Sequence, residues 1–388
     1  MSTLALIAVS VLVVAVAAIG TVFFAYPAVL WMVSRRRVEA VSTPTDWPRA
    51  SLIIAVRNGA ELLRAKLQNA VGLTYPKDRL EVVVFSDGST DATESVARAH
   101  DGLSVVVLSS AEHIGKAAAL NRAAAAASGD VLLFSDADAR LAPDAIERMV
   151  RHLVDPGIGG VCGRRRIGEP GAFLESAQSR YVSMDSLVKQ LESRAGSITS
   201  NDGKIYCIRR ELFAQIPDGV TDDLFVALNV IARGSRFVFE PEAVAFIRVP
   251  ARDTGHEVRR RRRIVSRSLR GIFLMRRLLN PLRFGRFAFG LMVNKLCRRL
   301  LPVWLGLLLL TSAYLASSEM WAVGLLALQG AFYLTAALHL ALGRMRGPIG
   351  RLSSVAFFFC LGIFGTWLGL VDFFSNRSVT KWDPIKSD

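Results

Sequence analysis

The sequence predicts an α/β fold in which a mostly parallel sheet, flanked by helices, is joined to transmembrane α-helices. Three observations predict it. Short apolar runs rich in β-branched residues recur in the first half of the chain, helical stretches lie between them, and long apolar runs lie near both ends. The 388 residues suffice for one substantial globular domain plus membrane segments.

Four of the apolar runs are short enough to be strands that are buried on both faces of a sheet. They cover residues 51–56, 81–85, 103–108 and 131–134. Helical stretches separate them, at residues 60–71, 91–99 and 115–127. Strands that alternate with helices indicate a parallel, doubly wound sheet, in which ligands bind beyond the carboxyl ends of the strands. We therefore expect the site in the loops after Val56, Phe85 and Phe134.

The long apolar runs predict one N-terminal and about three C-terminal transmembrane helices. Residues 4–33 carry no charge, and a spanning helix needs ~20 apolar residues. No basic segment precedes this run and no small-residue cleavage pattern ends it, which favours an uncleaved anchor over residues 1–37. The C-terminal region 299–376 contains the other three runs, at 300–316, 320–342 and 355–374.

Basic residues beside the apolar runs predict the topology. Arg35, Arg36 and Arg37 follow the first run, so the positive-inside rule places the N-terminus outside and the domain 48–250 in the cytoplasm. The third C-terminal span would place the tail 377–388 outside, whereas the basic residues in that tail favour the cytoplasm, so its side stays open. The four cysteines have no metal-knuckle or redox-pair spacing, which fits reduced thiols in a bacterial cytoplasm beneath the inner or plasma membrane.

The net charge of +15 indicates an anionic partner, and the distribution of arginines identifies it. They cluster at 35–37, 259–263 and 276–299, all next to apolar runs. This pattern is typical of a protein on a membrane surface, and no nucleic-acid-binding motif accompanies it. The sequence therefore predicts a basic amphipathic interfacial region at 251–298, with membrane lipids as partners and no nucleic acid.

Two carboxylates follow the fourth predicted strand, in Asp136-Ala137-Asp138. In an extended segment, side chains at this spacing point the same way. Close carboxylates repel unless a cation lies between them, and oxygen ligands suit Mg²⁺ or Mn²⁺, which also bind diphosphates. The alternative interpretation is a polar loop in which Asp138 caps the next helix. We name Asp136 and Asp138 as candidate ligands of a divalent cation.

Three further motifs have both a chemical and a structural interpretation. Asp87-Gly88 could accept hydrogen bonds from a base or ribose, or form an ordinary strand–turn–helix connection. Lys116 opens a helix, where it could hold an anion or remain a solvated lysine. Asp222-Asp223 could supply a general base or cap a helix. The arginines at 259–263 could neutralise a departing diphosphate or form a juxtamembrane patch.

The order of these motifs over about residues 48–380 resembles the family 2 glycosyltransferases, specifically the membrane-bound group that includes chitin-oligosaccharide, hyaluronan and cellulose synthases. The resemblance implies a GT-A fold that binds a UDP-sugar and transfers the sugar with inversion. Asp136 and Asp138 match the D-x-D metal motif of the family. Asp223 falls where its catalytic base stands, and Asp222 lies beside it on the acceptor side.

The remaining site residues are implied by the same resemblance. Ser86-Asp87-Gly88-Ser89 is similar to the nucleotide-contacting stretch, with Asp87 at the base, and Lys116 stands in a G-K-x-x-A-L-N element. Asn58 resembles the asparagine of the first loop, although Gly59 replaces the acid that usually follows. Asp202-Gly203 resembles the acceptor-side loop.

One motif departs from the family pattern. Processive members carry Q-x-x-R-W, whereas this chain has Arg260 and Ile264 at the glutamine and tryptophan positions and keeps the arginine as Arg263. We expect Arg260 on the donor side and Arg263 to assist departure of the diphosphate. The missing tryptophan lies at the acceptor end in the family, so the case for long-chain polymerisation is weaker.

The sequence thus predicts an inverting, membrane-anchored transferase that moves sugar from a nucleotide-sugar donor to a saccharide or lipid-linked acceptor, with an export partner among its expected partners. A single-addition transferase acting on a lipid-linked sugar stays open beside a polymer synthase. A non-enzymatic membrane scaffold is a second class, which the joint presence of the acids and Arg263 disfavours. A transporter would need ionisable residues inside the spans, and His339 is almost the only one there.

Overall fold

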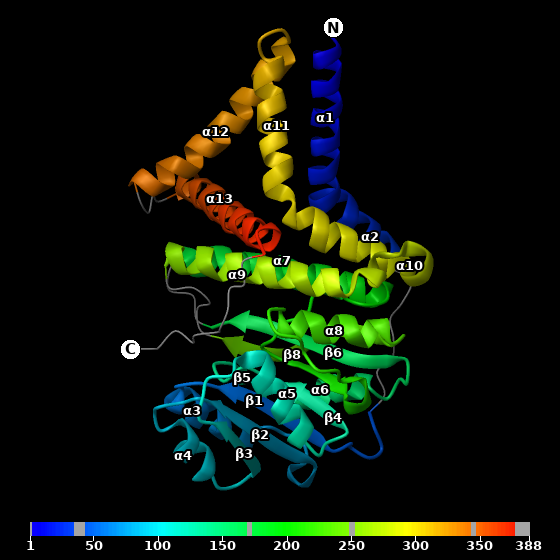
Figure 1. The fold of residues 1–388 in the computed structure, drawn as a ribbon, viewed down its shortest axis with the longest axis vertical. Helices are drawn as coiled ribbons and strands as arrows, with labels where there is room; N and C mark the ends of the chain where they lie inside the picture. Colours follow the sequence, from blue (N-terminus) through cyan, green and yellow to red (C-terminus); the bar gives the residue numbers. More distant parts are fainter. Residues whose placement is uncertain (1, 35–42, 169–172, 248–252, 343–346, 377–388) are drawn as a thin grey trace.

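The structure is a computed structural model that describes residues 2–34, 43–168, 173–247, 253–342 and 347–376. The arginines at 35–37 and the tail 377–388 lie outside the described residues. Figure 1 shows a sheet domain at one end, apolar helices at the other, and long helices between them.

The parallel half of the predicted sheet is confirmed. Four strands occur in the expected places and pair in parallel, in the order β3-β2-β1-β4. They are β1 (Ala50–Val56), β2 (Leu80–Asp87), β3 (Ser104–Ser110) and β4 (Val131–Phe134). Every residue of β1 and β4 is buried, as the continuous apolar runs predict.

Four further strands extend the sheet beyond β4, in the order β7-β6-β8-β5. They are β7 (Tyr206–Arg209), β6 (Ile158–Ile167), β8 (Arg236–Ile247) and β5 (Arg140–Leu141). Strand β7 is antiparallel to both β4 and β6, and β5 is antiparallel to β8, whereas β6 and β8 are parallel. The sheet is therefore mixed, and the antiparallel β7 brings the segment before Tyr206 to the carboxyl end of β4.

Helices cover both faces of the sheet because successive side chains of each strand point to opposite sides. Leu52 and Ile54 pack in one buried cluster with Leu63, whereas Ile53 and Phe85 belong to the other cluster. The covering helices are α3 (Ala60–Val71), α4 (Thr93–Arg98), α5 (Lys116–Ala126), α6 (Ala145–His152) and α8 (Asp222–Ala232). Short 3₁₀ turns occur at η2 (Lys77–Arg79), η3 (Arg210–Leu212) and η4 (Arg276–Leu279).

The apolar helices partly match the prediction. Within the described ranges, three helices are long and apolar enough to cross a membrane: Thr3–Ser34, Met320–Ala341 and Gly350–Phe374. The first consists of α1 (Thr3–Gly20), the π-helical turn η1 (Thr21–Ala25) and α2 (Tyr26–Ser34), and the others lie within α12 (Met320–Leu342) and α13 (Gly347–Phe374).

The predicted span at 300–316 belongs to a bent pair of helices. Helix α11 (Leu301–Leu315) has 15 residues, which is about 22 Å at 1.5 Å per residue and shorter than a bilayer core. It passes as a span only together with the segment Pro281–Cys297, from which it is bent by 61°. That segment contains α10 (Pro281–Gly290) and the π-helical η5 (Leu291–Cys297).

Helices α7 (Phe173–Ala195) and α9 (Thr254–Leu274) form a layer between the sheet and the apolar helices (Figure 1). A buried polar network ties this layer to the N-terminal helix. Glu192 of α7 accepts hydrogen bonds from the Tyr26 hydroxyl at 2.5 Å, from the Asn294 amide at 3.0 Å and from the Thr199 backbone at 2.8 Å. The N-terminal apolar helix is therefore joined to the loop that precedes β7.

Helix α13 runs beside the basic helix α9, and glycines make the close approach possible (Figure 1). A Cβ atom added at Gly369 would lie 2.7 Å from Cβ of Val265 and 2.8 Å from the Arg262 carbonyl oxygen. One turn on, the Asp372 carboxylate accepts two hydrogen bonds from Arg262, at 2.6 and 2.7 Å. The orientation of α9 is therefore fixed by a helix of the membrane region.

His339 packs as expected, with Nδ1 3.2 Å from the Ser353 hydroxyl.

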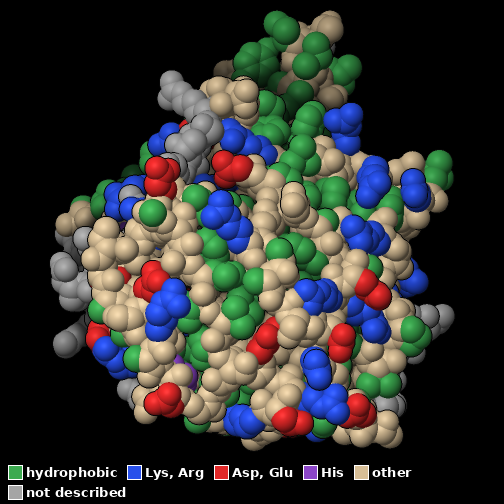
Figure 2. Space-filling view, turned by 60° about the horizontal axis from the view of Figure 1, so that its bottom comes forward, with side chains coloured by type: hydrophobic (Ala, Val, Ile, Leu, Met, Phe, Trp, Pro, Cys, Tyr) green, Lys and Arg blue, Asp and Glu red, His purple; other side chains and the backbone are tan. Residues whose placement is uncertain are grey.

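Figure 2 shows the face of the sheet domain that lies away from the apolar helices. Lysine and arginine side chains are interspersed with aspartate and glutamate over this face. A mixed surface of this kind gives solubility rather than affinity for one charged polymer. It agrees with the expectation that the basic excess belongs to the membrane-proximal part of the chain.

Candidate functional site

The predicted site residues meet at the carboxyl end of β4, where α5 and α8 begin and the loop before β7 passes. Lys116 connects two of the predicted acid pairs: its Nζ lies 3.0 Å from Asp136 Oδ1 and 2.9 Å from Asp222 Oδ2. Gly203 lies beside them, because a Cβ atom there would be 3.6 Å from Asp223 Oδ2 and 3.8 Å from Lys116 Nζ. Three motifs that are far apart in sequence thus form one cluster.

Lys204, which the sequence reasoning did not single out, completes this cluster. Its Nζ lies 3.0 Å from Asp136 Oδ2, 2.7 Å from Asp138 Oδ1 and 2.8 Å from Asp138 Oδ2. Burial alone would raise the pKa of Asp136, but the Lys116 and Lys204 ammonium groups outweigh it and hold this pKa below its usual range. Asp136 is therefore a permanent anion between two lysines.

The segment that carries Asp136 and Asp138 is a turn rather than an extended stretch. The Ala139 N–H donates to the Asp136 carbonyl at 3.1 Å. The buried Lys66 ammonium group holds both ends of the turn. It donates to the Ser135 hydroxyl at 2.7 Å and to the Ala139 carbonyl at 2.8 Å. Both carboxylates still converge on one ammonium group, because the turn is pinned on either side.

Asp223 lies at the start of α8 and differs from its neighbours. Its Oδ1 accepts the Leu224 N–H at 2.7 Å, and its backbone carbonyl accepts the Asn201 amide at 3.0 Å. Burial and the negative charge of Asp222 raise the pKa of Asp223 to about 7, although Lys116 opposes them. A half-buried carboxylate with a pKa near neutral pH suits a general base. Asp222 pairs with Lys116 and does not cap α8, whose N-cap is Thr221.

Tyr206 is a second residue that the sequence did not identify as part of this cluster. Its ring is buried and stacks on Phe134 with a centroid separation of 4.8 Å. Burial and the charges of Asp222, Asp223 and Asp136 raise the pKa of its hydroxyl. Among the described residues this hydroxyl has no hydrogen-bond partner. A buried hydroxyl without a partner is uncommon in folded proteins, which marks this position beside the acids as unusual.

The predicted donor loops are tightly built. Asp87 is fully buried and accepts hydrogen bonds from the backbone of Ile114 at 2.7 Å and of Gly115 at 3.0 Å, with His113 Nδ1 at 2.8 Å. In this structure Asp87 holds the loop that leads into Lys116, and its carboxylate offers no exposed oxygen to a base. Its predicted contact with the base stays a prediction, beside this role in holding the loop.

Gly88 and Asn58 shape the same edge of the site. Gly88 has a φ of +61°, and a Cβ atom there would lie 2.6 Å from the His113 nitrogen, so only glycine fits. The Asn58 side-chain oxygen accepts the Thr90 N–H at 2.8 Å, which joins the loops after β1 and β2. The loops predicted to carry the donor site therefore do lie together.

The predicted acceptor-side residue Asp202 and the predicted Arg260 of α9 make ion pairs of their own. Asp202 is buried and pairs with Arg165 at 3.3 Å and Lys189 at 3.8 Å. Arg260 donates to Glu257 of its own helix at 2.9 Å. Burial and Arg267 lower the pKa of Arg263, whereas the charges of Asp222 and Asp136 raise it. Arg263 of α9 therefore lies within electrostatic reach of the acid cluster.

The carboxylate oxygens of Asp136 and Asp138 suit a divalent cation that takes few of its ligands from the protein. Asp136 and Asp138 present oxygen atoms that already converge on a cationic group, the Lys204 ammonium. Among the described residues no three His, Cys, Asp or Glu side chains are grouped so as to hold a metal ion. Mg²⁺-type ions commonly bind through one or two carboxylates and complete their shell with water and substrate phosphates.

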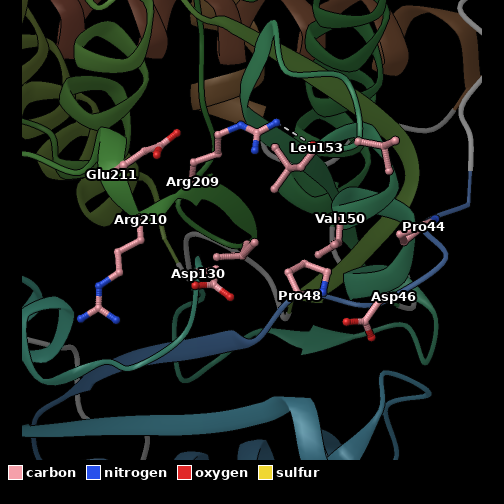
Figure 3. Close-up of a pocket in the computed structure, with 11 residues that line it drawn as sticks. Pro44, Asp46, Pro48, Asp130, Val150, Leu153, Arg209, Arg210 and Glu211 are labelled. Carbon is pink, nitrogen blue, oxygen red and sulfur yellow. Dashed lines mark hydrogen bonds between the residues drawn. The ribbon is translucent and has the colours of Figure 1, made fainter.

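A pocket of about 670 Å³ lies elsewhere, at the amino ends of β1 and β4 (Figure 3). Its lining includes Pro48, Asp130, Leu153 and Arg209, none of them a predicted site residue. Arg209 donates to the carbonyl oxygen of Leu153 at 2.6 Å, as the dashed line in Figure 3 marks. Ligands of doubly wound sheets bind at the opposite, carboxyl ends, so the acid cluster is the better candidate.

Comparison with known proteins agrees with this geometry. Residues 51–216 match the profile of glycosyl transferase family 2. Poly-beta-1,6-N-acetyl-D-glucosamine synthase of Staphylococcus aureus is 28% identical over 207 residues, which cover 52% of this chain and 50% of that protein. Probable glycosyltransferase YdaM of Bacillus subtilis is 26% identical over 220 residues, which cover 53% and 52%. The chain spans about half the length of the curated relatives it matches.

One solved structure is similar over almost the whole chain. It is a mannosyltransferase from Pyrobaculum calidifontis in complex with GDP-Man and Mn²⁺. The TM-score is 0.70 at 25% identity, and the match covers 95% of this chain and 99% of that one. The similarity therefore includes the apolar helices as well as the sheet domain.

Proposed function

We propose that the family 2 glycosyltransferase domain of this chain catalyses an inverting transfer from a nucleoside-diphosphate sugar to a saccharide or lipid-linked acceptor at a membrane surface. One observation carries the proposal. Asp136, Lys116, Asp222 and Asp223 come from three separate motifs and meet at the carboxyl end of β4. Such a cluster combines a place for a diphosphate with a carboxylate whose pKa is near 7.

Asp223 is the proposed general base. An acceptor hydroxyl is a weak nucleophile at neutral pH, so its proton must leave as the new bond forms. Asp223 removes that proton while the hydroxyl oxygen attacks the anomeric carbon from the side opposite the diphosphate. A single displacement of this kind inverts the configuration, so an α-linked donor gives a β-linked product. Lys116 and Arg263 offset the negative charge that develops on the leaving diphosphate.

Asp136 and Asp138 are the proposed ligands of a divalent cation, Mg²⁺ or Mn²⁺. When bound, such a cation neutralises charge on the diphosphate. The relative from Pyrobaculum, whose structure holds GDP-Man and Mn²⁺, supports a nucleotide sugar and a cation. The resemblance of the motifs supports a UDP-sugar for this chain.

An assay on the full chain in lipid nanodiscs tests the reaction itself. A panel of UDP- and GDP-sugars is incubated with Mg²⁺ or Mn²⁺ and with saccharide or polyprenyl-phosphate acceptors. Release of the nucleoside diphosphate and the mass of the product are measured, and the anomeric configuration of the product is determined. Product length separates a polymer synthase from a single-addition transferase. A purified, folded chain that turns over no donor in the panel would favour a non-enzymatic scaffold.

We expect Asp138→Ala to abolish donor turnover while the protein still folds and inserts. The substitution removes the more exposed carboxylate of the pair, which has 45% side-chain exposure, and so leaves the buried sheet untouched. Turnover is compared with Asp155→Ala, a change of the same type in a loop on the other end of the sheet domain. Normal turnover of Asp138→Ala, or activity that survives exhaustive chelation, would exclude this cation site.

The proposed topology places the sheet domain in the cytoplasm and the N-terminus outside. In Figure 1 the N-terminus and the turn between α11 and α12 lie at the end opposite the sheet. Exposed apolar side chains of α10, such as Leu282 (97%) and Phe289 (46%), lie near Arg283 and Arg286 in the chain, as expected for a helix at a lipid interface. An export partner remains a proposal.

Cysteine labelling checks this topology. In a background with Cys297 and Cys360 replaced by serine, a cysteine at Ser317 should react with an impermeant maleimide added outside intact cells. A cysteine at Asp101, in the sheet domain, should react only after the membrane is opened. Both positions are exposed, so access through the protein does not limit either reaction. Labelling at position 101 in intact cells would overturn the assignment.

A further inference from the structure

Lys204 occupies a defined place between the two proposed cation ligands. Its ammonium nitrogen lies within 3.0 Å of Asp136 and within 2.8 Å of both oxygens of Asp138. The backbone at this position is also held. The Ser135 hydroxyl donates to the Lys204 carbonyl at 2.7 Å, and the Lys204 N–H donates to Asp202 Oδ1 at 3.3 Å. The lysine therefore enters the site from a fixed main chain.

The second lysine leaves no free oxygen on Asp136. Lys116 is 3.0 Å from Oδ1 and Lys204 is 3.0 Å from Oδ2. A bare divalent cation that binds to Asp136 and Asp138 must displace the Lys204 ammonium, because two cations at this distance from the same oxygens repel. The side chain of Lys204 is 20% exposed and has a flexible four-carbon stem. Its ammonium group can therefore move away from the two aspartates once another anion accepts its hydrogen bonds.

We propose that Lys204 is a built-in counter-cation of the Asp136–Asp138 pair, which makes the divalent cation bind tightly only together with the donor diphosphate. The inference rests on the proposed function, because it takes this pair as the cation site. The diphosphate supplies acceptor oxygens for the displaced ammonium, so donor and cation each strengthen the binding of the other. This coupling is reciprocal by thermodynamic necessity.

Lys116 does not share this role. It bridges Asp136 to Asp222, whereas Lys204 contacts both proposed cation ligands. Removal of Lys204 therefore leaves the Asp136–Asp138 pair without this ammonium group. The ion pairs by which Lys116 connects Asp136 to α8 are kept. The acids that remain would repel each other, and a bare cation would relieve that repulsion.

Binding of Mn²⁺ to the full chain in detergent or nanodiscs tests the proposal without an activity assay. Free Mn²⁺ is followed by electron paramagnetic resonance, alone and with saturating UDP or GDP. We expect Lys204→Met to bind Mn²⁺ alone about tenfold or more tightly than the unaltered chain, within the usual range of coupling between sites. The gain on adding the nucleoside diphosphate should shrink by a similar factor.

Three companion variants make the outcome decisive. Lys204→Gln repeats the loss of charge with a polar side chain, in case the methionine disturbs folding. Lys77→Met removes the same charge from a lysine that donates to carbonyls at the end of α3, and should leave Mn²⁺ binding unchanged. Asp138→Ala combined with Lys204→Met should lose the tightened binding, which locates the cation at this pair.

The failure of this inference differs from the failure of the proposed cation site. If the unaltered chain binds Mn²⁺ with the nucleotide, and neither Lys204 variant binds Mn²⁺ alone more tightly, the counter-cation role is wrong and the cation site stands. If no variant binds Mn²⁺ at this pair with or without nucleotide, both ideas fall, and Lys204 would serve in place of a metal.

Discussion

Asp223→Asn should lower the transfer rate by ~10²–10⁴-fold while the affinity for the donor stays within a small factor of that of the unaltered chain. The amide is nearly the same size as the carboxylate and can still accept the Leu224 N–H that Asp223 Oδ1 accepts at 2.7 Å. It cannot accept a proton from the acceptor hydroxyl. The loss should therefore fall on the chemical step, and equilibrium donor binding and transfer rate should be measured on one preparation.

The pH profile gives the same residue a second test. Burial and Asp222 raise the pKa of Asp223 to about 7 from its ordinary value of 3.8. A base must be ionised to act, so transfer should fall about tenfold per pH unit below about pH 7 and level off above it. This limb should be missing from the residual activity of Asp223→Asn.

Asp223→Asn should stabilise the folded protein at the same time as it lowers the transfer rate. A carboxyl group whose pKa is raised by folding is most costly to the folded state above that raised pKa, and the cost disappears as pH falls below the unfolded value. Asp223→Asn should therefore raise the melting temperature at about pH 8 and have little effect at about pH 4. A variant that gains stability while it loses transfer would separate a catalytic residue from a structural cap.

Asp218→Asn is the matched control for these measurements. Asp218 lies in the loop that precedes α8, is exposed, and accepts the Gly219 N–H at 2.8 Å. The same chemical change there should alter neither transfer nor its pH profile. Near-normal transfer in Asp223→Asn, or retention of configuration in the product, would remove Asp223 from the mechanism.

The parallel half of the sheet was predictable because each strand is one continuous apolar run. The other half was not, since β6 reads Ile158-Gly159-Gly160-Val161 and ends in arginines. Its glycines are required by packing rather than by strand propensity. A Cβ atom at Gly159 would lie 2.3 Å from Leu212, and one at Gly160 would lie 2.5 Å from the Phe237 ring. Contacts of this kind depend on the tertiary structure and leave no period in the sequence.

The residues of the candidate site were likewise predicted only in part. The acids and Lys116 were predicted because they stand in spaced motifs at the ends of predicted elements. Lys66 and Lys204 were missed because each is a single residue whose role comes from what surrounds it. Asp87 shows a related case: the motif was found, but its three hydrogen bonds to the loop before Lys116 depend on the tertiary structure.

Gly369→Leu should reduce transfer by ~10²-fold, although residue 369 is remote in sequence from every predicted site residue. A Cβ atom there would lie 2.7 Å from Cβ of Val265 and 2.8 Å from the Arg262 carbonyl oxygen, so α9 and α13 must separate. Separation would also strain the two hydrogen bonds between Arg262 and Asp372. Arg263 lies on α9 next to these contacts, so its guanidinium would move with the helix. Displacement of about 1 Å in a catalytic group can cost this much in rate.

The same substitution at Gly330 of α12 is the control, because a Cβ atom there meets no described atom within 4 Å. Both variants place a leucine in an apolar helix, so any general effect of bulk in the membrane region appears in both. Transfer rate, donor affinity and melting temperature are measured for each in nanodiscs. Gly330→Leu should retain the transfer rate, and Gly369→Leu should lose it while keeping donor affinity. Equal rates in the two variants would show that α13 does not set the position of the arginine helix.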